Sequence, residues 1–253
     1  MTNKIRKDPG SISMFALTLP LALEQFFRVL VSSVDTIMLS SFDNAAVAAV
    51  GMTSQYVFFI NILFNIVCTG SVIVLSQYIG AKKSREELNG IVKASVTLVT
   101  LFAVIISIAV ILGTGALLNC YTLEDAVRSY AKEYFVIFCG FGSVFIAFNL
   151  MQGAVVRAYG YSKEILFSTM IANIINVLGN ALSLYGWFGL PVFGLPGVAI
   201  ASVTGNFVSC IYLQVVIRRH EEIAFDLRTI YKIDFSFIKK ILKVGVPTAG
   251  ENM

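Results

Sequence analysis

The chain has 253 residues, of which 57% are hydrophobic and 13% are charged, and its mean hydropathy is +0.81. A soluble domain has about 25% charged residues. This composition therefore excludes a soluble fold with an apolar core and a polar surface, and it indicates a membrane protein. The net charge is +4, and the basic residues gather in the loops, which points to membrane orientation and anionic headgroups and argues against nucleic-acid binding.

Six apolar segments follow one another along the chain. Each contains the roughly 20 mostly apolar residues that a helix needs to cross a hydrocarbon core about 30 Å thick. The first is too long for the apolar region of a cleaved signal peptide and holds three charged residues, so we interpret it as a crossing. The sequence therefore predicts an all-α membrane protein, a six-transmembrane-helix bundle with helices at residues 14–40, 45–79, 89–113, 126–152, 165–187 and 198–217.

Lys and Arg residues lie almost entirely on one side of these segments. The exceptions are Arg128 and Lys132 on the other side and Arg28 inside the first segment. Since cytoplasmic loops carry an excess of basic residues, this pattern places the N-terminus and every second loop in the cytoplasm. We therefore expect a multi-pass protein of the plasma membrane, embedded in the lipid bilayer, with a cytoplasmic N-terminus.

Three charged residues inside the first segment lie on one stripe of the predicted helix. Glu24, Arg28 and Asp35 are four and seven residues apart, which places them within about 40° of one another. Glu24 and Arg28 are about 6 Å apart along the axis and should pair, whereas Asp35 is about 10 Å from Arg28 and has no cation on its own helix. Asp35 is therefore the candidate ion-coupling residue, because an intramembrane carboxylate without a counter-charge gains from binding a proton or a cation. The Glu24–Arg28 pair either belongs to the same site or is purely architectural.

Pro20 lies fifteen residues before Asp35 on the same predicted helix. Because proline has no N–H, it removes a hydrogen bond from the helix interior. The sequence therefore predicts a helix bend at Pro20.

The fifth segment contributes a second polar stripe. Asn173, Asn176 and Asn180 are three and four residues apart and share one helix face. Hydrogen bonding between helices is the simpler explanation for any one of them. We favour the alternative that the stripe faces Asp35 across a substrate cavity.

Metal, cofactor and enzyme functions find little support in the sequence. The four cysteines are isolated from one another, and the single histidine, His220, follows two arginines after the sixth segment. A structural metal site would need a Cys–His cluster, and an intramembrane enzyme would need a nucleophile–base pair. We therefore expect a protein that is not an enzyme and that binds no metal or cofactor.

Glycines and prolines crowd residues 186–197, between the fifth and sixth segments. This composition predicts a tight turn on the outer surface that cannot remain helical.

The end of the chain departs from the six-segment pattern. We divide the chain into a six-helix N-lobe at 1–217, a cytoplasmic connector at 218–236 and the start of a seventh helix at 237–253. A proline followed four residues later by a glutamate, in both the first and the seventh segments, resembles an internal repeat whose second copy is cut short.

A set of short motifs occurs in order along nearly the whole chain. They are 19–20 (LP) with 34–37 (VDTI), 75–81 (LSQYIGA), 156–163 (VRAYGYSK), 176–180 (NVLGN) and 194–202 (GLPGVAIAS). In this order and at these spacings they resemble the N-terminal half of a multidrug and toxic compound extrusion (MATE) transporter.

This resemblance implies a twelve-helix antiporter of two six-helix lobes, whose C-terminal lobe lies outside this chain. Such a protein would expel cationic amphipathic drugs in exchange for H⁺ or Na⁺. Asp35 matches the family's first-helix aspartate, the favoured coupling residue, and Asn176 matches a polar position near it. Asn180 stands where part of the family has a second aspartate, which leaves the choice between H⁺ and Na⁺ open.

A flippase for lipids or lipid-linked oligosaccharides, built on a related scaffold, is the alternative function. Its anionic head groups would require several Arg or Lys residues inside the segments. Only Arg28 lies within one, which argues against this alternative.

Overall fold

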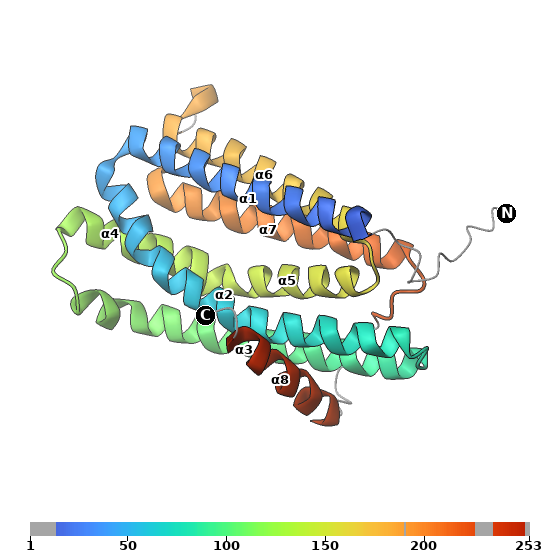
Figure 1. Ribbon diagram of the computed structural model, residues 1–253. Coiled ribbons are helices and arrows are strands. Elements are labelled where there is room, and N and C mark those ends of the chain that lie inside the picture. Colours follow the sequence, from blue (N-terminus) through green and yellow to red (C-terminus); the bar gives the residue numbers. More distant parts are fainter. Residues whose placement is uncertain (1–13, 190, 226–234, 251–253) are drawn as a thin grey trace.

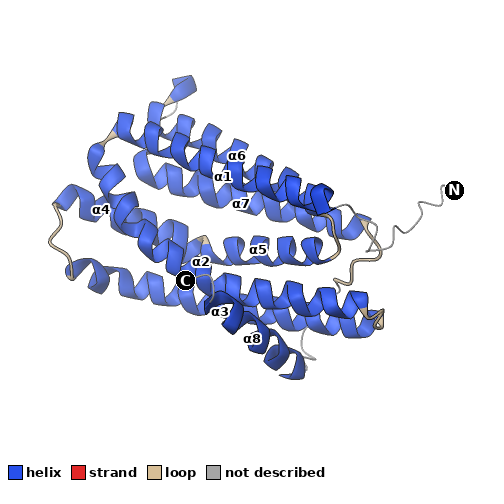
Figure 2. Cartoon of the chain, in the orientation of Figure 1, coloured by secondary structure: helices blue, strands red, loops and turns tan. Residues whose placement is uncertain are grey.

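The computed structural model describes residues 14–189, 191–225 and 235–250. Within these residues every regular element is a helix (Figures 1 and 2). The expected cytoplasmic N-terminus at 1–13 and half of the connector, at 226–234, lie outside the described residues. The predicted fold class, an all-α bundle, is confirmed.

The helices follow the six predicted segments to within a few residues at most ends. Four helices of the described chain, α2, α3, α6 and α7, are long and apolar enough to cross a membrane, and α4 with η2 and α5 makes a bent fifth span. The helix α1, with 29 residues, is also long enough to cross, although it carries three charged residues. The bounds are α1 (Met14–Phe42), α2 (Asn44–Gly80), α3 (Arg85–Asn119), α4 (Asp125–Phe135), the π-helix η2 (Val136–Phe141), α5 (Ser143–Ala158), α6 (Ser162–Tyr185), the 3₁₀-helix η3 (Trp187–Gly189), α7 (Gly194–Arg219) and α8 (Phe235–Gly250).

The long helices form two groups with α5 between them (Figure 1). On one side α6 packs against both α1 and α7, and on the other side α2 packs against α3 and α8. The helix α5 contacts α2, α3 and α7, so it joins the two groups. Phe64, Met151 and Leu213, from α2, α5 and α7, are fully buried in the shared core.

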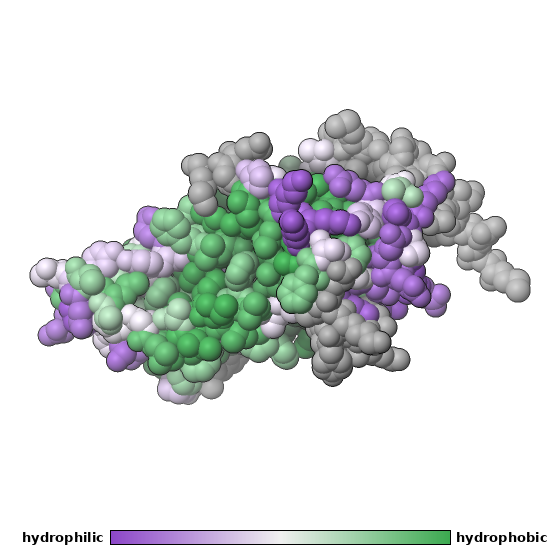
Figure 3. Space-filling view, turned by 90° about the horizontal axis from the view of Figure 1, so that it is seen from below, coloured by the Kyte–Doolittle hydropathy of each residue, from purple (hydrophilic) through white to green (hydrophobic). Residues whose placement is uncertain are grey.

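The outer surface exposes more large apolar side chains than the surface of a soluble protein usually does. Leu112 is 78% exposed, and Val29 and Ile37 are each 66% exposed. In Figure 3 the apolar surface occupies the middle of the molecule, and hydrophilic residues gather toward its ends. A bundle that exposes large apolar side chains around its middle is suited to a hydrocarbon environment.

The N-terminus of α3 is fixed by a capping box. The Ser84 side chain accepts a hydrogen bond from the Glu87 N–H, and the Glu87 carboxylate accepts one from the Ser84 N–H at 3.2 Å. The cap therefore gives α3 a defined start immediately after the turn that follows α2.

The helix α8 crosses α2 at a point where both helices carry glycine. A methyl group on Gly70 would overlap the carbonyl oxygen of Ile241, and one on Gly245 would overlap the carbonyl oxygen of Ile66. Two backbones can approach this closely only where neither residue has a side chain. The Gly70–Gly245 crossing therefore determines how α8 lies on the bundle.

The glycine- and proline-rich stretch at 186–197 is only partly a turn. The prediction that it cannot remain helical is wrong for its last four residues, because α7 already begins at Gly194. Pro196 is the third residue of α7. The first N–H groups of a helix have no acceptor within it, so a proline there removes no hydrogen bond.

Candidate functional site

Asp35 on α1 lies against α6 and is partly buried there. Its Oδ1 accepts a hydrogen bond from Nδ2 of Asn180 at 2.8 Å. Asn180 is itself fully buried in α6. The predicted stripe of asparagines thus brings at least one side chain into contact with Asp35.

Asn176 lies between Asp35 and Ser202 of α7. With its Nδ2 turned toward the carboxylate, the amide donates to Oδ1 of Asp35 at 3.0 Å and to Oδ2 at 3.1 Å, and its oxygen accepts from the Ser202 hydroxyl at 2.6 Å. The opposite orientation would set the amide oxygen against an ionised carboxylate that has no proton to give. Asp35, Asn176, Asn180 and Ser202 therefore form one polar cluster, the Asp35 cluster, shared by α1, α6 and α7.

Two polar atoms on the asparagine stripe remain without a partner in the described part of the chain. They are Oδ1 of Asn180 and Nδ2 of Asn173, both of which are buried. The Asn180 oxygen belongs to the Asp35 cluster, where a bound ion could satisfy it. Asn173 shares the helix face but makes no bond to Asp35, so the structure does not bring it into the cluster.

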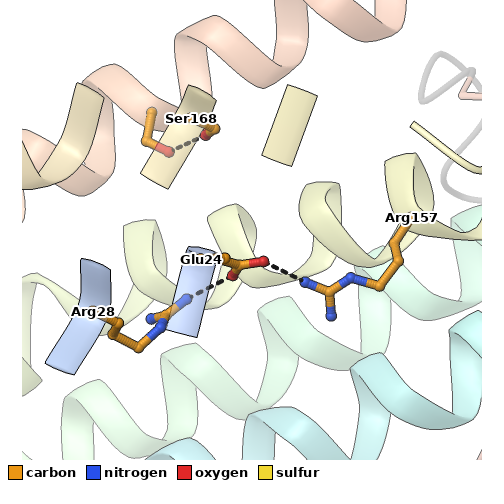
Figure 4. A network of polar contacts seen from close by, with 5 residues as sticks. Glu24, Arg28, Arg157 and Ser168 are labelled. Carbon is orange, nitrogen blue, oxygen red and sulfur yellow. Dashed lines mark hydrogen bonds and ion pairs between the residues drawn. The ribbon is translucent and has the colours of Figure 1, made fainter. Parts of the chain in front are cut away.

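A second polar centre surrounds Glu24, closer to the start of α1. Its Oε1 accepts from the Arg28 guanidinium at 2.9 Å, and its Oε2 accepts from the guanidinium of Arg157, at the end of α5, at 3.3 Å (Figure 4). The Glu24 side chain is only 4% exposed, whereas the Arg28 and Arg157 side chains are 54% and 40% exposed. The predicted Glu24–Arg28 pair is confirmed, and it forms a centre separate from Asp35, which we call the Glu24 cluster.

The two centres differ in chemistry. The Asp35 cluster pairs one carboxylate with amide and hydroxyl groups, which suits a proton or a hard cation. The Glu24 cluster holds two guanidinium groups and one carboxylate, so it carries a net positive charge. In the described residues no group of three His, Cys, Asp or Glu side chains could hold a metal ion. Pro20 is buried inside α1, one turn before Glu24.

The sequence analysis missed Arg157 and Ser202 as members of these clusters. Arg157 sits at the end of its segment among loop residues, where a solvated side chain is the ordinary expectation. Ser202 belongs to a run of small residues on α7 that shows no charge or periodicity to single it out. A search for hydrogen-bond partners of the Asn176 amide could have found Ser202, whereas Arg157 carries no local signal.

Comparisons with known proteins agree with this architecture. The chain is 29% identical to the "Uncharacterized transporter YisQ" of Bacillus subtilis, over 96% of this chain and 53% of that protein. It is 29% identical to the "Probable multidrug resistance protein NorM" of Thermotoga maritima, over 98% of this chain and 52% of that protein.

A solved structure described as an outward-facing multidrug resistance MATE family transporter of the MOP superfamily superposes with a TM-score of 0.83 at 21% identity, covering 92% of this chain and 51% of that one. The chain thus spans about half the length of the relatives that it matches. The MatE family model matches residues 20–182, more than half of the sequence. The chain therefore belongs to the MatE family of multidrug and toxic compound extrusion transporters.

Proposed function

We propose that this chain forms the N-terminal six-helix lobe of a secondary active exporter. With a C-terminal lobe, it would expel cationic amphipathic compounds in exchange for H⁺ or Na⁺. The names of relatives such as the Thermotoga maritima NorM protein support a drug substrate and do not favour a flippase. The basic loops, which predict a cytoplasmic N-terminus, indicate which end of the bundle faces the cytoplasm.

The observation that carries the proposal is the environment of Asp35. Within the described residues its hydrogen-bond partners are amide groups, and no Lys or Arg pairs with it. An intramembrane carboxylate that lacks a counter-charge is a functional residue by default. The buried oxygen of Asn180 beside it provides a further ligand for a cation.

Coupling follows from competition for one carboxylate. When a proton or Na⁺ occupies the Asp35 cluster, its negative charge is neutralised and its attraction for a cationic substrate is weakened. If H⁺ is the coupling ion, the two orientations of the Asn176 amide fit the empty and the occupied state. The amide donates to an ionised Asp35 through Nδ2, and after it turns over it accepts from a protonated Asp35 while its Nδ2 faces Ser202.

The test is Asp35→Asn in the two-lobed protein, reconstituted in liposomes under an imposed H⁺ or Na⁺ gradient. The variant keeps the shape of the side chain but removes its charge. Export of a cationic dye should therefore fall about tenfold, a factor that corresponds to the loss of a typical coupling free energy. Asp125→Asn removes a carboxylate from the exposed start of α4 and should export normally. Export by Asp35→Asn at the wild-type rate would show that Asp35 is structural. Comparison of the two gradients in the unmodified protein identifies the coupling ion.

A further inference from the structure

We infer that Arg28 and Arg157 form an anion-recognising subsite around Glu24, which binds the carboxylate of a substrate whose cationic group lies at Asp35. The inference rests on the proposed function and extends it from simple cations to molecules that carry both charges. It also gives a role to the Glu24 cluster, which the coupling scheme does not use.

The charges and donors of the cluster are unbalanced. One buried carboxylate neutralises only one of two guanidinium groups, so a positive charge remains. Each guanidinium has five N–H donors. Among the described residues, Arg28 and Arg157 each donate one side-chain hydrogen bond, and in both cases the acceptor is Glu24. The remaining donors of Arg28 and Arg157 lie on side chains that are about half exposed. This arrangement suits a planar anion with two oxygens.

The exposed part of Arg28 does not face the same way as the apolar surface of α1. Phe26 and Ile37, which are 60% and 66% exposed, lie about 160° and 180° around the helix from Arg28. Gln25 and Ser32, which lie three and four residues from Arg28 along the helix, are exposed and polar. Because a charged side chain in hydrocarbon is costly, Arg28 faces an aqueous or ligand-filled region rather than lipid tails.

The two clusters are suitably placed for one ligand. Arg28 and Asp35 are seven residues apart on the same helix, α1, which corresponds to about 10 Å along the axis. An elongated molecule with an amine at one end and a carboxylate at the other can contact both. The Arg residues would then discriminate such a molecule from a monocation of the same shape.

A matched pair of dyes tests the inference. One is a rhodamine with a free carboxylate, and the other is its methyl ester, which keeps the cationic ring system but has no anionic group. Their dissociation constants are measured by fluorescence anisotropy on the complete protein in phosphatidylcholine nanodiscs. Lys163→Gln removes an exposed charge near the same end of the bundle and serves as the control.

The Arg and Glu variants should have opposite effects. Arg28→Gln and Arg157→Gln should weaken binding of the carboxylate dye about tenfold, the loss expected for one charge-assisted hydrogen bond, and should leave the methyl ester unchanged. Glu24→Gln should strengthen binding of the carboxylate dye roughly three- to fivefold, because it removes the competing carboxylate. If Glu24→Gln fails to fold in a thermal melt, the two Arg variants still decide the question.

Two outcomes would overturn the inference. If the Glu and Arg variants weaken both dyes alike, the cluster only holds α1 against α5. If the Arg variants change binding only in nanodiscs that contain phosphatidylglycerol, the bound anion is a lipid headgroup. If Asp35→Asn does not change the binding of the methyl ester, that result contradicts the proposed function instead. The effect of the Arg variants on binding of the carboxylate dye would still test the subsite.

Discussion

Two carboxylates on the same helix, Glu24 and Asp35, have opposite environments. Glu24 lies between two guanidinium groups, whereas Asp35 lies against amides. In an ion pair of the first kind each charge already has a partner, and removal of one partner leaves an uncompensated charge behind. Asp35 has no such partner, so its charge remains available to an exchangeable ion.

The sequence predicted the part of these sites that depends on helix periodicity. Glu24 and Arg28 are four residues apart on one helix, which brings their side chains together. Asp35 faces Asn180 because the polar stripes of their two helices must both avoid lipid. The bond from Arg157 to Glu24 spans 133 residues. Nothing in the local sequence of either residue specifies it, because it depends on how α5 packs beside α1.

Pro20 provides a prediction at the residue scale. Pro20→Ala restores an N–H in the interior of α1, where proline costs about 3 kcal/mol relative to alanine. We expect a higher melting temperature and slower ion-driven export, with a smaller loss than in Asp35→Asn. Pro196→Ala is the control, since Pro196 lies in the first turn of α7 and interrupts no helical hydrogen bond. Equal rates for Pro20→Ala and the unmodified protein would show that the bend predicted at Pro20 has no part in transport.

At the scale of elements, the sequence predicted long helices well and their interruptions poorly. Residues 126–152 read as one straight segment, but the structure divides the span into α4, η2 and α5, with a bend of 46° between the two halves. No proline marks this break. A π-helix breaks the regular α-helical ladder and is a known cause of sharp kinks, and hydropathy alone does not reveal its position.

The Gly70–Gly245 crossing gives a prediction with an internal control. In Gly70→Ala the new methyl group would overlap the backbone of α8, so the change should displace α8 and destabilise the bundle by about 1–3 kcal/mol. Gly51→Ala lies on the same helix, α2, with no atom near the added methyl, and should be stabilising by up to about 1 kcal/mol. Thermal denaturation in detergent measures both changes. A melting temperature for Gly70→Ala equal to that of Gly51→Ala would contradict the close approach.

For the whole molecule, the testable property is its orientation in the membrane. The turns after α2 and after α3 carry the exposed residues Ser84 and Thr122, and the 35-residue helix α3 separates them by about 50 Å. The basic loops predict that Ser84 is cytoplasmic and Thr122 is outside. In cysteine variants of each position, a membrane-impermeant maleimide should label residue 122 in intact cells and residue 84 only after lysis.

The natural cysteines define the background for this labelling. Cys120 is exposed two residues from Thr122, so it must first be replaced by serine, whereas Cys68, Cys139 and Cys210 are buried. Labelling of residue 84 in intact cells would reverse the orientation.

The π-helix also bears on which insertions and deletions the chain tolerates. A π turn holds about one residue more than an α turn, so η2 could lose a residue and still be helical. Locally, such a deletion would relieve an irregularity. Six residues of a π-helix turn through about the same angle as five residues of an α-helix, so the deletion would leave α4 in nearly the same rotation relative to α5, and Phe135 would keep its packing against Tyr56. The π-helix thus absorbs the extra residue, and a homologue that lacks it can keep the same faces of α4 and α5 against the core.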